Sequence, residues 1–338
     1  MSAEVRVLRS GLHTTVQDLG RAGHQHEGVP VCGAMDAAAL RLANLLVGNP
    51  EGAASLEVTL IGPTLELAGD VLLSVTGADL SASLDERPLA PGRMVHACAG
   101  SQLTFGPRAT GCRAYVAFAG GIAVPPVLGS RSTYLAARLG GMRGRALVSG
   151  DVLPIAEPGA CSRALAAAVG RGRCAPWRPA AFAGDTAAVG NAEDAIEVRA
   201  LRGRHFAALT SPARGVLLGG DAEWFTVSGA SDRMGYRLEG PALALEEPLE
   251  LISEGVAFGT VQLPPDGAPI VLMADRQTTG GYPRVLEVAS VDRRLLAQAR
   301  PGTRVRFREI SLDEARRVYI AREHELARLA DAIALRAR

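Results

Sequence analysis

The residues best suited to chemistry stand in one run, Asp275 to Pro283, directly after an apolar segment that ends at Met273. A carboxylate can act as a base or orient a guanidinium, and a guanidinium can bind a carboxylate or phosphate through two hydrogen bonds. Hydroxyls and glycine N–H groups can stabilise a developing oxyanion. We predict catalytic roles for Asp275, Arg276, Gln277, Thr278 and Thr279, and substrate binding by Gly280, Gly281 and Tyr282. The alternative for this run is a plain hairpin turn.

Two further polar stretches follow strands in the same part of the chain. In Ser228–Leu238 we predict a catalytic role for Asp232 and substrate binding by Arg233 and Tyr236, because loops on rigid β scaffolds carry binding residues. The alternative is a salt-bridged surface turn. In the Gly-rich stretch Ile252–Pro264, Glu254 and Gln262 are the predicted substrate-binding residues, since glycines let the backbone approach a ligand closely.

A fourth cluster lies near the start of the chain, where a polar loop leads into a predicted helix. A helix N-terminus preceded by glycine is a natural anion site, and an Arg adds a forked donor. The predicted substrate-binding residues here are Gln17, Asp18, Arg21, Met35 and Asp36. The alternative is that Asp36 only caps the helix.

Two other features give weak signals. His24 and His26 lie two residues apart, but no third ligand is evident, so we predict no metal site. Gly140–Gly144 only loosely resembles a phosphate-binding loop, and without Lys we interpret it as a turn.

The elements that position these residues are mostly short strands between Gly and Pro turns, which predicts a mainly β protein of barrel or sandwich type. Helical spacing is found at Met35–Val47, at Ser162–Val169 and in the amphipathic segment from Leu312 to about Ala334, which opens with the capping-box pattern Ser311-x-x-Glu314. The predicted strands are Glu4–Leu8, Leu56–Leu60, Asp70–Val75, Arg113–Phe118, Ile196–Leu201, Glu223–Val227, Pro269–Met273 and Thr303–Phe307.

With 338 residues the chain is long enough for two domains. We predict an N-terminal β domain over residues 1–195, with a linker or excursion near 156–195 that is rich in Ala, Gly, Arg and Pro. A second β domain is predicted over 196–310, followed by a C-terminal amphipathic helix over 311–338.

All 36 basic residues are Arg, and together with 35 acidic residues they give a net charge of +1. Because the chain has no Lys, it cannot form a Schiff base or carry covalent biotin. The balanced charge argues against nucleic acid or an anionic membrane as a partner. Five Cys without a C-x-x-C pair and no apolar run of signal-peptide length favour a cytoplasmic protein.

Several of these motifs together resemble one family, allophanate hydrolase subunit 2, also described as the biotin-dependent carboxyltransferase family and including KipA-like proteins and the C-type subunits of prokaryotic 5-oxoprolinases. The resemblance runs from about Val5 to Phe307, and Asp275–Pro283 is its most specific part. The other segments that carry it are Thr14–Arg21, Gly33–Asp36, Asn44–Asn49, Leu56-Glu57, Gly129–Thr133 and Ser231–Tyr236.

The resemblance implies two cyclophilin-like β-barrel domains and a companion B-type subunit, with an A-type subunit also expected. It implies ATP-dependent opening of the lactam of 5-oxoproline to L-glutamate, with ATP bound on this chain, on a partner or between them. Two alternatives stay open: a carboxyltransferase component that uses carboxybiotin from another chain on urea or a related amide, and a KipA-like regulatory subunit without turnover.

Overall fold

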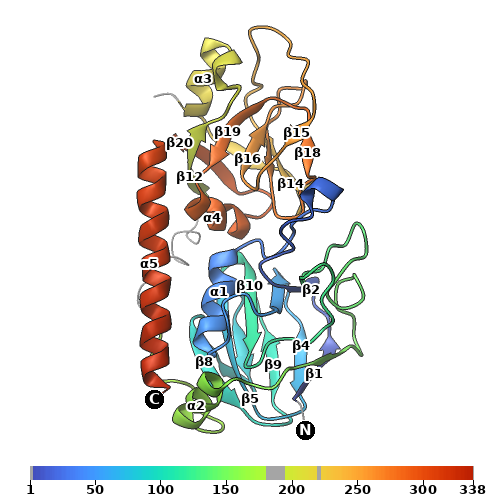
Figure 1. The fold of residues 1–338 in the computed structure, drawn as a ribbon, viewed down its shortest axis with the longest axis vertical. Coiled ribbons are helices and arrows are strands. Elements are labelled where there is room, and N and C mark those ends of the chain that lie inside the picture. The colour runs from blue at the N-terminus through green and yellow to red at the C-terminus, as the bar shows by residue number, and fades with distance from the viewer. Residues whose placement is uncertain (1–2, 180–194, 219–221, 338) are drawn as a thin grey trace. The chain divides into compact units, whose positions relative to one another are not determined.

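The computed structural model describes residues 3–179, 195–218 and 222–337 (Figure 1). The chain divides into two compact units. Among the described residues, unit 1 contains 3–21, 32–179 and 324–337, and unit 2 contains 22–31, 195–218 and 222–323. The predicted division at residue 195 stays a prediction, because residues 180–194 lie outside the described part of the chain.

Unit 1 is built from two antiparallel sheets that share one apolar core, formed by residues such as Val58, Leu73 and Val116. One sheet has the order β11-β1-β4-β9-β6-β7 and the other the order β2-β3-β10-β5-β8. The strands of the first sheet are β1 (Glu4–Arg9), β4 (Thr64–Leu67), β6 (Ala82–Leu84), β7 (Arg87–Pro88), β9 (Gln102–Phe105) and β11 (Val152–Pro154). Those of the second are β2 (His13–Gln17), β3 (Ser55–Thr59), β5 (Val71–Asp79), β8 (Arg93–Ala97) and β10 (Thr110–Phe118).

Helices cover the outer face of the second sheet, which explains why β10 is buried along nearly its whole length. They are α1 (Ala37–Leu46), α2 (Ala160–Val169) and the later part of α5 (Leu312–Arg336). Leu40, Tyr115, Leu165 and Leu326 belong to this second core. An apolar strand of this kind is expected where both faces of a sheet are covered.

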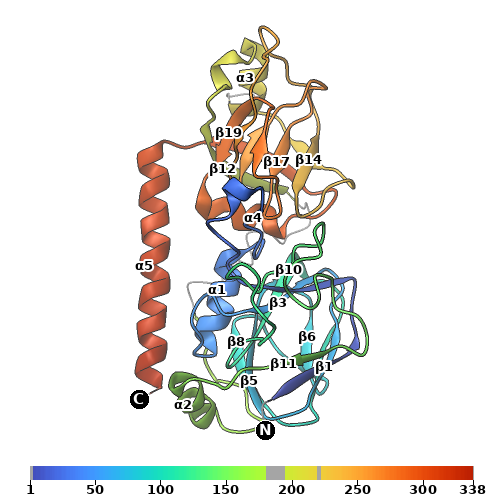
Figure 2. The ribbon, with the colours of Figure 1, turned by 45° about the vertical axis from the view of Figure 1, so that its right-hand side comes forward.

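Unit 2 contains a closed barrel with the strand order β12-β19-β16-β17-β14-β13-β20. Its neighbours pair antiparallel except β12 and β20, whose parallel pairing closes the barrel. Figures 1 and 2 show α3 (Ser211–Leu218) and α4 (Arg293–Gln298) at opposite ends of this barrel. The strands are β12 (Ala195–Arg202), β13 (Phe225–Val227), β14 (Gly235–Glu239), β16 (Thr260–Gln262), β17 (Ile270–Leu272), β19 (Arg284–Val288) and β20 (Arg304–Glu309).

The polar loop between β17 and β19 contains the short strand β18 (Thr279–Gly280). This strand pairs with β15 (Glu254–Gly255) in a separate two-stranded sheet. The barrel interior is apolar, and the rings of Phe225 and Phe307 lie 6.4 Å apart within it. The loop that carries the predicted chemistry is therefore attached to a rigid support at both ends.

The expectation of a mainly β protein with a terminal helix is confirmed, and each of the eight predicted strand segments coincides with a strand. The N–H group of Glu314 donates to the Ser311 hydroxyl over 3.2 Å, as the capping-box pattern predicts. None of the described helices is both long enough and apolar enough to cross a membrane.

Candidate functional site

Asp275 and Arg233 form a buried ion pair that joins two of the predicted clusters. The carboxylate of Asp275 accepts hydrogen bonds from Nε and Nη2 of Arg233 at 2.9 and 3.0 Å, and the N–H group of Asp275 donates to the Arg233 carbonyl at 2.8 Å. The exposed fraction is only 4% for Asp275 and 8% for Arg233. Arg233, rather than Arg276, is therefore the guanidinium that Asp275 orients, and the pair fixes the start of the 275–283 loop.

Arg276, the next residue, is held by backbone carbonyls. Its Nε donates to the Val256 carbonyl at 3.3 Å, and its Nη1 lies 3.4 and 3.5 Å from the carbonyls of Met273 and Ala274. These contacts keep a half-buried guanidinium at the foot of the loop.

Gln262 and Gln277 meet beside Gly280, which joins the third predicted cluster to the loop. The Gln277 amide donates to Oε1 of Gln262 over 3.4 Å, and Gln262 is 2% exposed. A Cβ at Gly280 would lie 2.5 Å from Nε2 of Gln262, so a larger residue there would displace the Gln262 amide. Gln262 is thus a structural neighbour of the loop as well as a predicted binding residue.

The outer part of the loop is open. Thr279 and Tyr282 are exposed, Gly281 is half-buried, and the Thr278 carbonyl accepts from the Val256 N–H group at 3.2 Å. Glu254, on the paired strand β15, forms surface ion pairs with Arg204 and Arg284. The carboxylate of Glu254 is therefore occupied by protein cations.

Two predicted residues, Asp232 and Tyr236, have hydrogen-bond partners in the turn and in the core. Asp232 is exposed, and its carboxylate accepts from the N–H groups of Met234 and Gly235 at 2.7 and 3.2 Å, as in an Asx turn. Tyr236 is 3% exposed, and its hydroxyl donates to the Ala299 carbonyl at 3.3 Å. For Asp232 these contacts match the alternative of a surface turn.

Sequence reasoning missed two charged residues of the barrel, Glu287 on β19 and Arg293 at the start of α4. The Thr260 hydroxyl donates to Oε2 of Glu287 over 2.8 Å, and burial raises the pKa of the Glu287 carboxyl above its ordinary value of 4.5. Burial also lowers the pKa of Arg293, and the nearby charge of Arg276 lowers it further. A single Glu between apolar strand residues was the available signal for Glu287.

Replacing Glu287 by Gln is expected to stabilise the protein as the pH rises. The folded-state pKa of Glu287 is raised, so burying its charged form destabilises the wild type above that pKa, whereas below 4.5 the carboxyl is protonated in both states. Gln keeps an acceptor for Thr260 and removes the charge. We expect the Tm of E287Q to exceed that of the wild type at pH 8 and to differ less from it at pH 4.5.

The matched control is Glu197→Gln, which removes an exposed carboxylate and should give no such dependence on pH. A Tm difference for E287Q that shrinks from pH 4.5 to pH 8 would contradict the interpretation.

Asp18 is the centre of a buried hydrogen-bond network in unit 1. Its carboxylate accepts from the hydroxyls of Ser130 and Ser132, each at 2.6 Å, and from the N–H groups of Arg131 and Gly20 at 2.6 and 2.8 Å. The Asp18 N–H group also donates to the Ser132 hydroxyl at 2.9 Å. The predicted Asp18 is therefore fully engaged by the Gly129–Thr133 segment.

Arg21 and Gln17 lie beside this network with unused hydrogen-bonding atoms. Arg21 is 1% exposed and donates through Nη2 to the Ser132 carbonyl, while its Nε and Nη1 have no partner within the described ranges. Gln17 donates to the Thr15 hydroxyl and the Thr133 carbonyl, and its Oε1 has no partner there. Both side chains retain the capacity to bind a polar ligand.

Met35 and Asp36 lie immediately before the N-terminus of α1. The Met35 N–H group donates to Glu57 at 2.9 Å, and the Asp36 N–H group donates to the Tyr115 hydroxyl at 2.8 Å. The Asp36 carboxylate accepts from the N–H group of Ala39 at 3.0 Å, so Asp36 does cap α1. Burial and the charge of Glu57 raise the pKa of Tyr115.

The Gly140–Gly144 stretch is packed against protein. A Cβ at Gly140 would lie 2.2 Å from the Ser132 carbonyl oxygen, and one at Gly141 would lie 1.9 Å from the Thr133 hydroxyl. The glycines therefore allow close chain packing, which agrees with a turn and does not fit a phosphate cradle.

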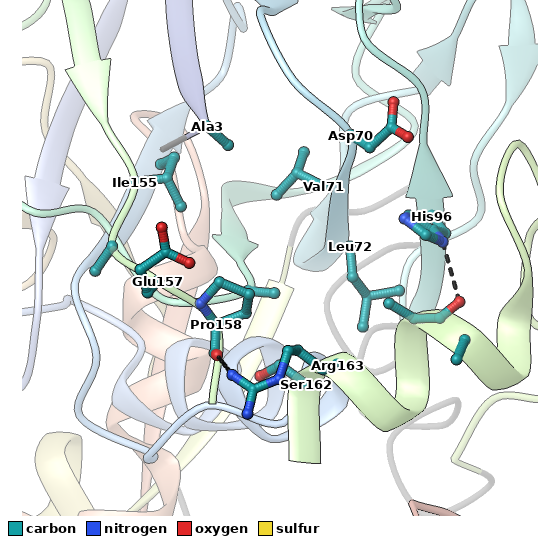
Figure 3. Close-up of a pocket in the computed structure, with 14 residues that line it drawn as sticks. Ala3, Asp70, Val71, Leu72, His96, Ile155, Glu157, Pro158, Ser162 and Arg163 are labelled. Atoms are coloured by element: carbon teal, nitrogen blue, oxygen red, sulfur yellow. Dashed lines mark hydrogen bonds between the residues drawn. The ribbon is translucent and has the colours of Figure 1, made fainter. Parts of the chain in front are cut away.

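A cavity of about 450 Å³ lies elsewhere in unit 1 (Figure 3). Its lining includes Asp70, His96, Glu157 and Arg163. The His96 ring donates from Nδ1 to the Ala166 carbonyl at 3.0 Å, and Arg163 donates to the Pro158 carbonyl at 2.5 Å. None of the predicted site residues lines this cavity.

Comparison with known proteins places most of the chain in one family model, described as carboxyltransferase domain, subdomain A and B, which matches residues 27–309. The C-type subunit of the 5-oxoprolinase of Escherichia coli is 41% identical over 314 residues, covering 92% of this chain and 93% of that protein. Its counterpart in Haemophilus influenzae is 38% identical over 311 residues, with the same coverage of 92% and 93%.

A solved structure extends the comparison to the fold. The K. lactis urea amidolyase matches with a TM-score of 0.83 at 27% identity and covers 97% of this chain. The chain spans only 20% of that amidolyase, whereas it spans nearly the full length of the two bacterial relatives.

Proposed function

Because the chain belongs to the carboxyltransferase domain family, subdomains A and B, we propose that it is one component of an ATP-dependent 5-oxoprolinase, which opens the lactam of 5-oxoproline to L-glutamate. The proposal is supported by 41% and 38% identity to two proteins named as C-type subunits of 5-oxoprolinase, over nearly the whole of both chains. The partners proposed are a B-type and an A-type subunit.

The reaction needs three things from protein side chains. The substrate carries a carboxylate, which must be bound; negative charge develops on the lactam carbonyl oxygen; and the departing nitrogen must gain a proton. Arg, amide and hydroxyl side chains can supply the first two functions. The 275–283 loop contains all three kinds of side chain.

The observation that carries the proposal at this site is the buried pair of hydrogen bonds between Arg233 and Asp275. This ion pair fixes Asp275, which directly precedes Arg276 and Gln277 in the loop. In the proposal Arg276 binds an anionic group, while Gln277, Thr278 and Thr279 hydrogen-bond to the substrate. Asp275 and Arg233 act as positioning residues, because their charges neutralise one another.

ATP would supply a phosphoryl group to the lactam carbonyl oxygen, which would activate the carbonyl carbon toward water, so that the C–N bond can break and phosphate is released together with glutamate. The described residues do not offer a phosphate cradle for it at Gly140–Gly144, where the glycines contact Ser132 and Thr133. We therefore assign the nucleotide to the assembled complex.

Carboxyl transfer is the second candidate, supported by the TM-score of 0.83 to a urea amidolyase. Since the chain has no Lys, it would accept a carboxyl group from biotin carried elsewhere. Genes for a biotin carboxylase and a biotin carrier next to the gene for this chain would favour this function.

We expect release of ADP and glutamate from 5-oxoproline and ATP only when this chain is mixed with both partner subunits. Each component alone should be inactive, because the proposed reaction is divided among subunits. The assay compares this chain, the partners and the reconstituted mixture.

Arg276→Ala should abolish turnover without dissolving the complex. Absence of activity in a wild-type complex shown to be intact would refute the proposal and favour carboxyl transfer or regulation. A regulatory protein would instead lose affinity for its partner, or show no change, when Arg276 is replaced.

A further inference from the structure

The cavity of about 450 Å³ in unit 1 is lined by α2, by β5 and β8 of the second sheet, and by residues 155–158 (Figure 3). Its volume is within the range of about 300–1,000 Å³ that is usual for small-molecule sites. Val71 and Leu72 of β5 form an apolar wall together with Ile155. A ligand that fits this cavity therefore has an apolar part of moderate size.

Glu157 supplies the cavity with a carboxylate that has no cation partner among the described residues. Figure 3 shows this carboxylate directed toward the middle of the cavity. The other acid of the lining, Asp70, is already engaged, because it pairs with Arg171 at 2.6 Å and accepts from the N–H group of Ala99 at 2.8 Å. Glu157 is therefore the acid that can bind a cationic group of a ligand.

Arg163 supplies a charge of the opposite sign at the same edge of the cavity. Its Nη1 donates to the carbonyl of Pro158, the residue after Glu157, at 2.5 Å. In the described part of the chain, however, no ion pair joins Arg163 to Glu157 or to another acid. A guanidinium has several N–H groups, so this single hydrogen bond leaves donors for an anionic group. The cavity thus has one uncompensated charge of each sign.

His96 and Ser162 add two uncharged polar groups to the lining. Nδ1 of His96 donates to the Ala166 carbonyl at 3.0 Å, which leaves Nε2 of the neutral ring as an acceptor, and Figure 3 shows Nε2 on the cavity side of the ring. Ser162 is 1% exposed, and its hydroxyl has no hydrogen-bond partner within the described ranges. A buried hydroxyl without a partner is destabilising, so it is expected to gain one when a ligand binds.

We propose that this cavity binds an α-amino acid with a branched apolar side chain, in its zwitterionic form. The ammonium group donates to Glu157 and to Nε2 of His96, the carboxylate accepts from Arg163 and Ser162, and the side chain packs against the apolar wall. A zwitterion is favoured over a simple anion or cation because the two uncompensated charges of the lining have opposite signs. No residue of the 275–283 loop lines the cavity, and the inference does not depend on the proposed function.

The test is isothermal titration calorimetry on the full chain with L-leucine and two analogues, isocaproate, which lacks the ammonium group, and isoamylamine, which lacks the carboxylate. We expect L-leucine to bind and each analogue to bind about 10-fold more weakly, because each loses one set of charge-assisted hydrogen bonds. Glu157→Gln should raise the Kd for L-leucine about 10-fold and leave the Kd for isocaproate unchanged. Arg163→Gln should have the same effect on L-leucine and leave the Kd for isoamylamine unchanged.

Glu197→Gln and Arg316→Gln are the matched controls, because they remove the same charges from exposed sites in unit 2 and should not change the binding of L-leucine. Ala167→Leu narrows the cavity without changing a charge, so it should also weaken binding and serves if a charge variant does not fold. The inference is overturned if the wild type does not bind L-leucine, or if either analogue binds as tightly as L-leucine. An unchanged Kd for L-leucine in either Glu157→Gln or Arg163→Gln would overturn it as well.

Discussion

Asp275→Asn should destabilise unit 2 by about 3–5 kcal/mol, because it leaves the Arg233 guanidinium buried without its negative partner. Both hydrogen bonds of the pair are at normal lengths, and both residues are at most 8% exposed, so water has little access to the Arg233 guanidinium. In thermal unfolding this corresponds to a fall in Tm of about 10 °C for a unit of this size. Turnover in the reconstituted complex should be lost with it, because the loop is no longer fixed.

A double variant separates the stability of the pair from its positioning role. Arg233→Met with Asp275→Leu removes both charges, and apolar replacement of a buried pair is often close to neutral for stability. We expect this variant to recover most of the lost Tm and none of the activity.

Glu197→Gln is the control for the loss of an ion pair in general, since Glu197 pairs with Arg306 on the surface and should change stability by less than about 1 kcal/mol. If D275N is as stable as wild type, the pair does not hold the loop.

The strands and helices could be predicted because their signals are local. Short β-branched and apolar runs between turn residues mark strands such as β5 and β10, and Asp36 followed by an apolar helical pattern marks the start of α1. The apolar run Ala114–Phe118 in β10 also agrees with burial of both faces of that strand, although Arg113 before it is buried too. Each of these inferences needs only neighbours along the chain.

The contacts of the candidate site could not be predicted in the same way, because they join distant residues. Arg233 and Asp275 are 42 positions apart, and their pairing depends on the register of β14 against β17. Along the chain the guanidinium next to Asp275 is that of Arg276, and spacing alone does not indicate a pair with Arg233. The correct partner is set by tertiary structure rather than by spacing.

The surroundings of Arg293 could not be predicted for a different reason. A charged residue at the start of a short helix has the same sequence pattern whether it faces water or lies against Phe258. The structure shows that Asp292, its neighbour, pairs with Arg199, whereas the Arg293 guanidinium lies over the Phe258 ring. Sequence alone does not indicate that Asp292 pairs with Arg199, which lies 93 positions away.

Asp18→Ala should be the most damaging single change in unit 1, because it removes the acceptor for two hydroxyls and two N–H groups. The hydroxyls of Ser130 and Ser132 can rotate toward other acceptors, but the N–H groups of Arg131 and Gly20 cannot. Leaving a buried donor unpaired is destabilising by about 1–3 kcal/mol, and because these two N–H groups are only partly buried we expect a total loss of about 2–4 kcal/mol in equilibrium unfolding. Asp18→Asn keeps one acceptor oxygen and should lose roughly half as much.

Asp79→Ala is the matched control, since the Asp79 carboxylate accepts from the N–H group of Ser81 at an exposed turn and its loss should change stability by less than about 1 kcal/mol. Hydrogen exchange at the Arg131 and Gly20 amides reports on the network directly. Both should lose protection in D18A, because the carboxylate is their acceptor. Retained protection with near wild-type stability would mean that the Gly129–Thr133 segment is held by other contacts, and that Asp18 is available for a ligand instead.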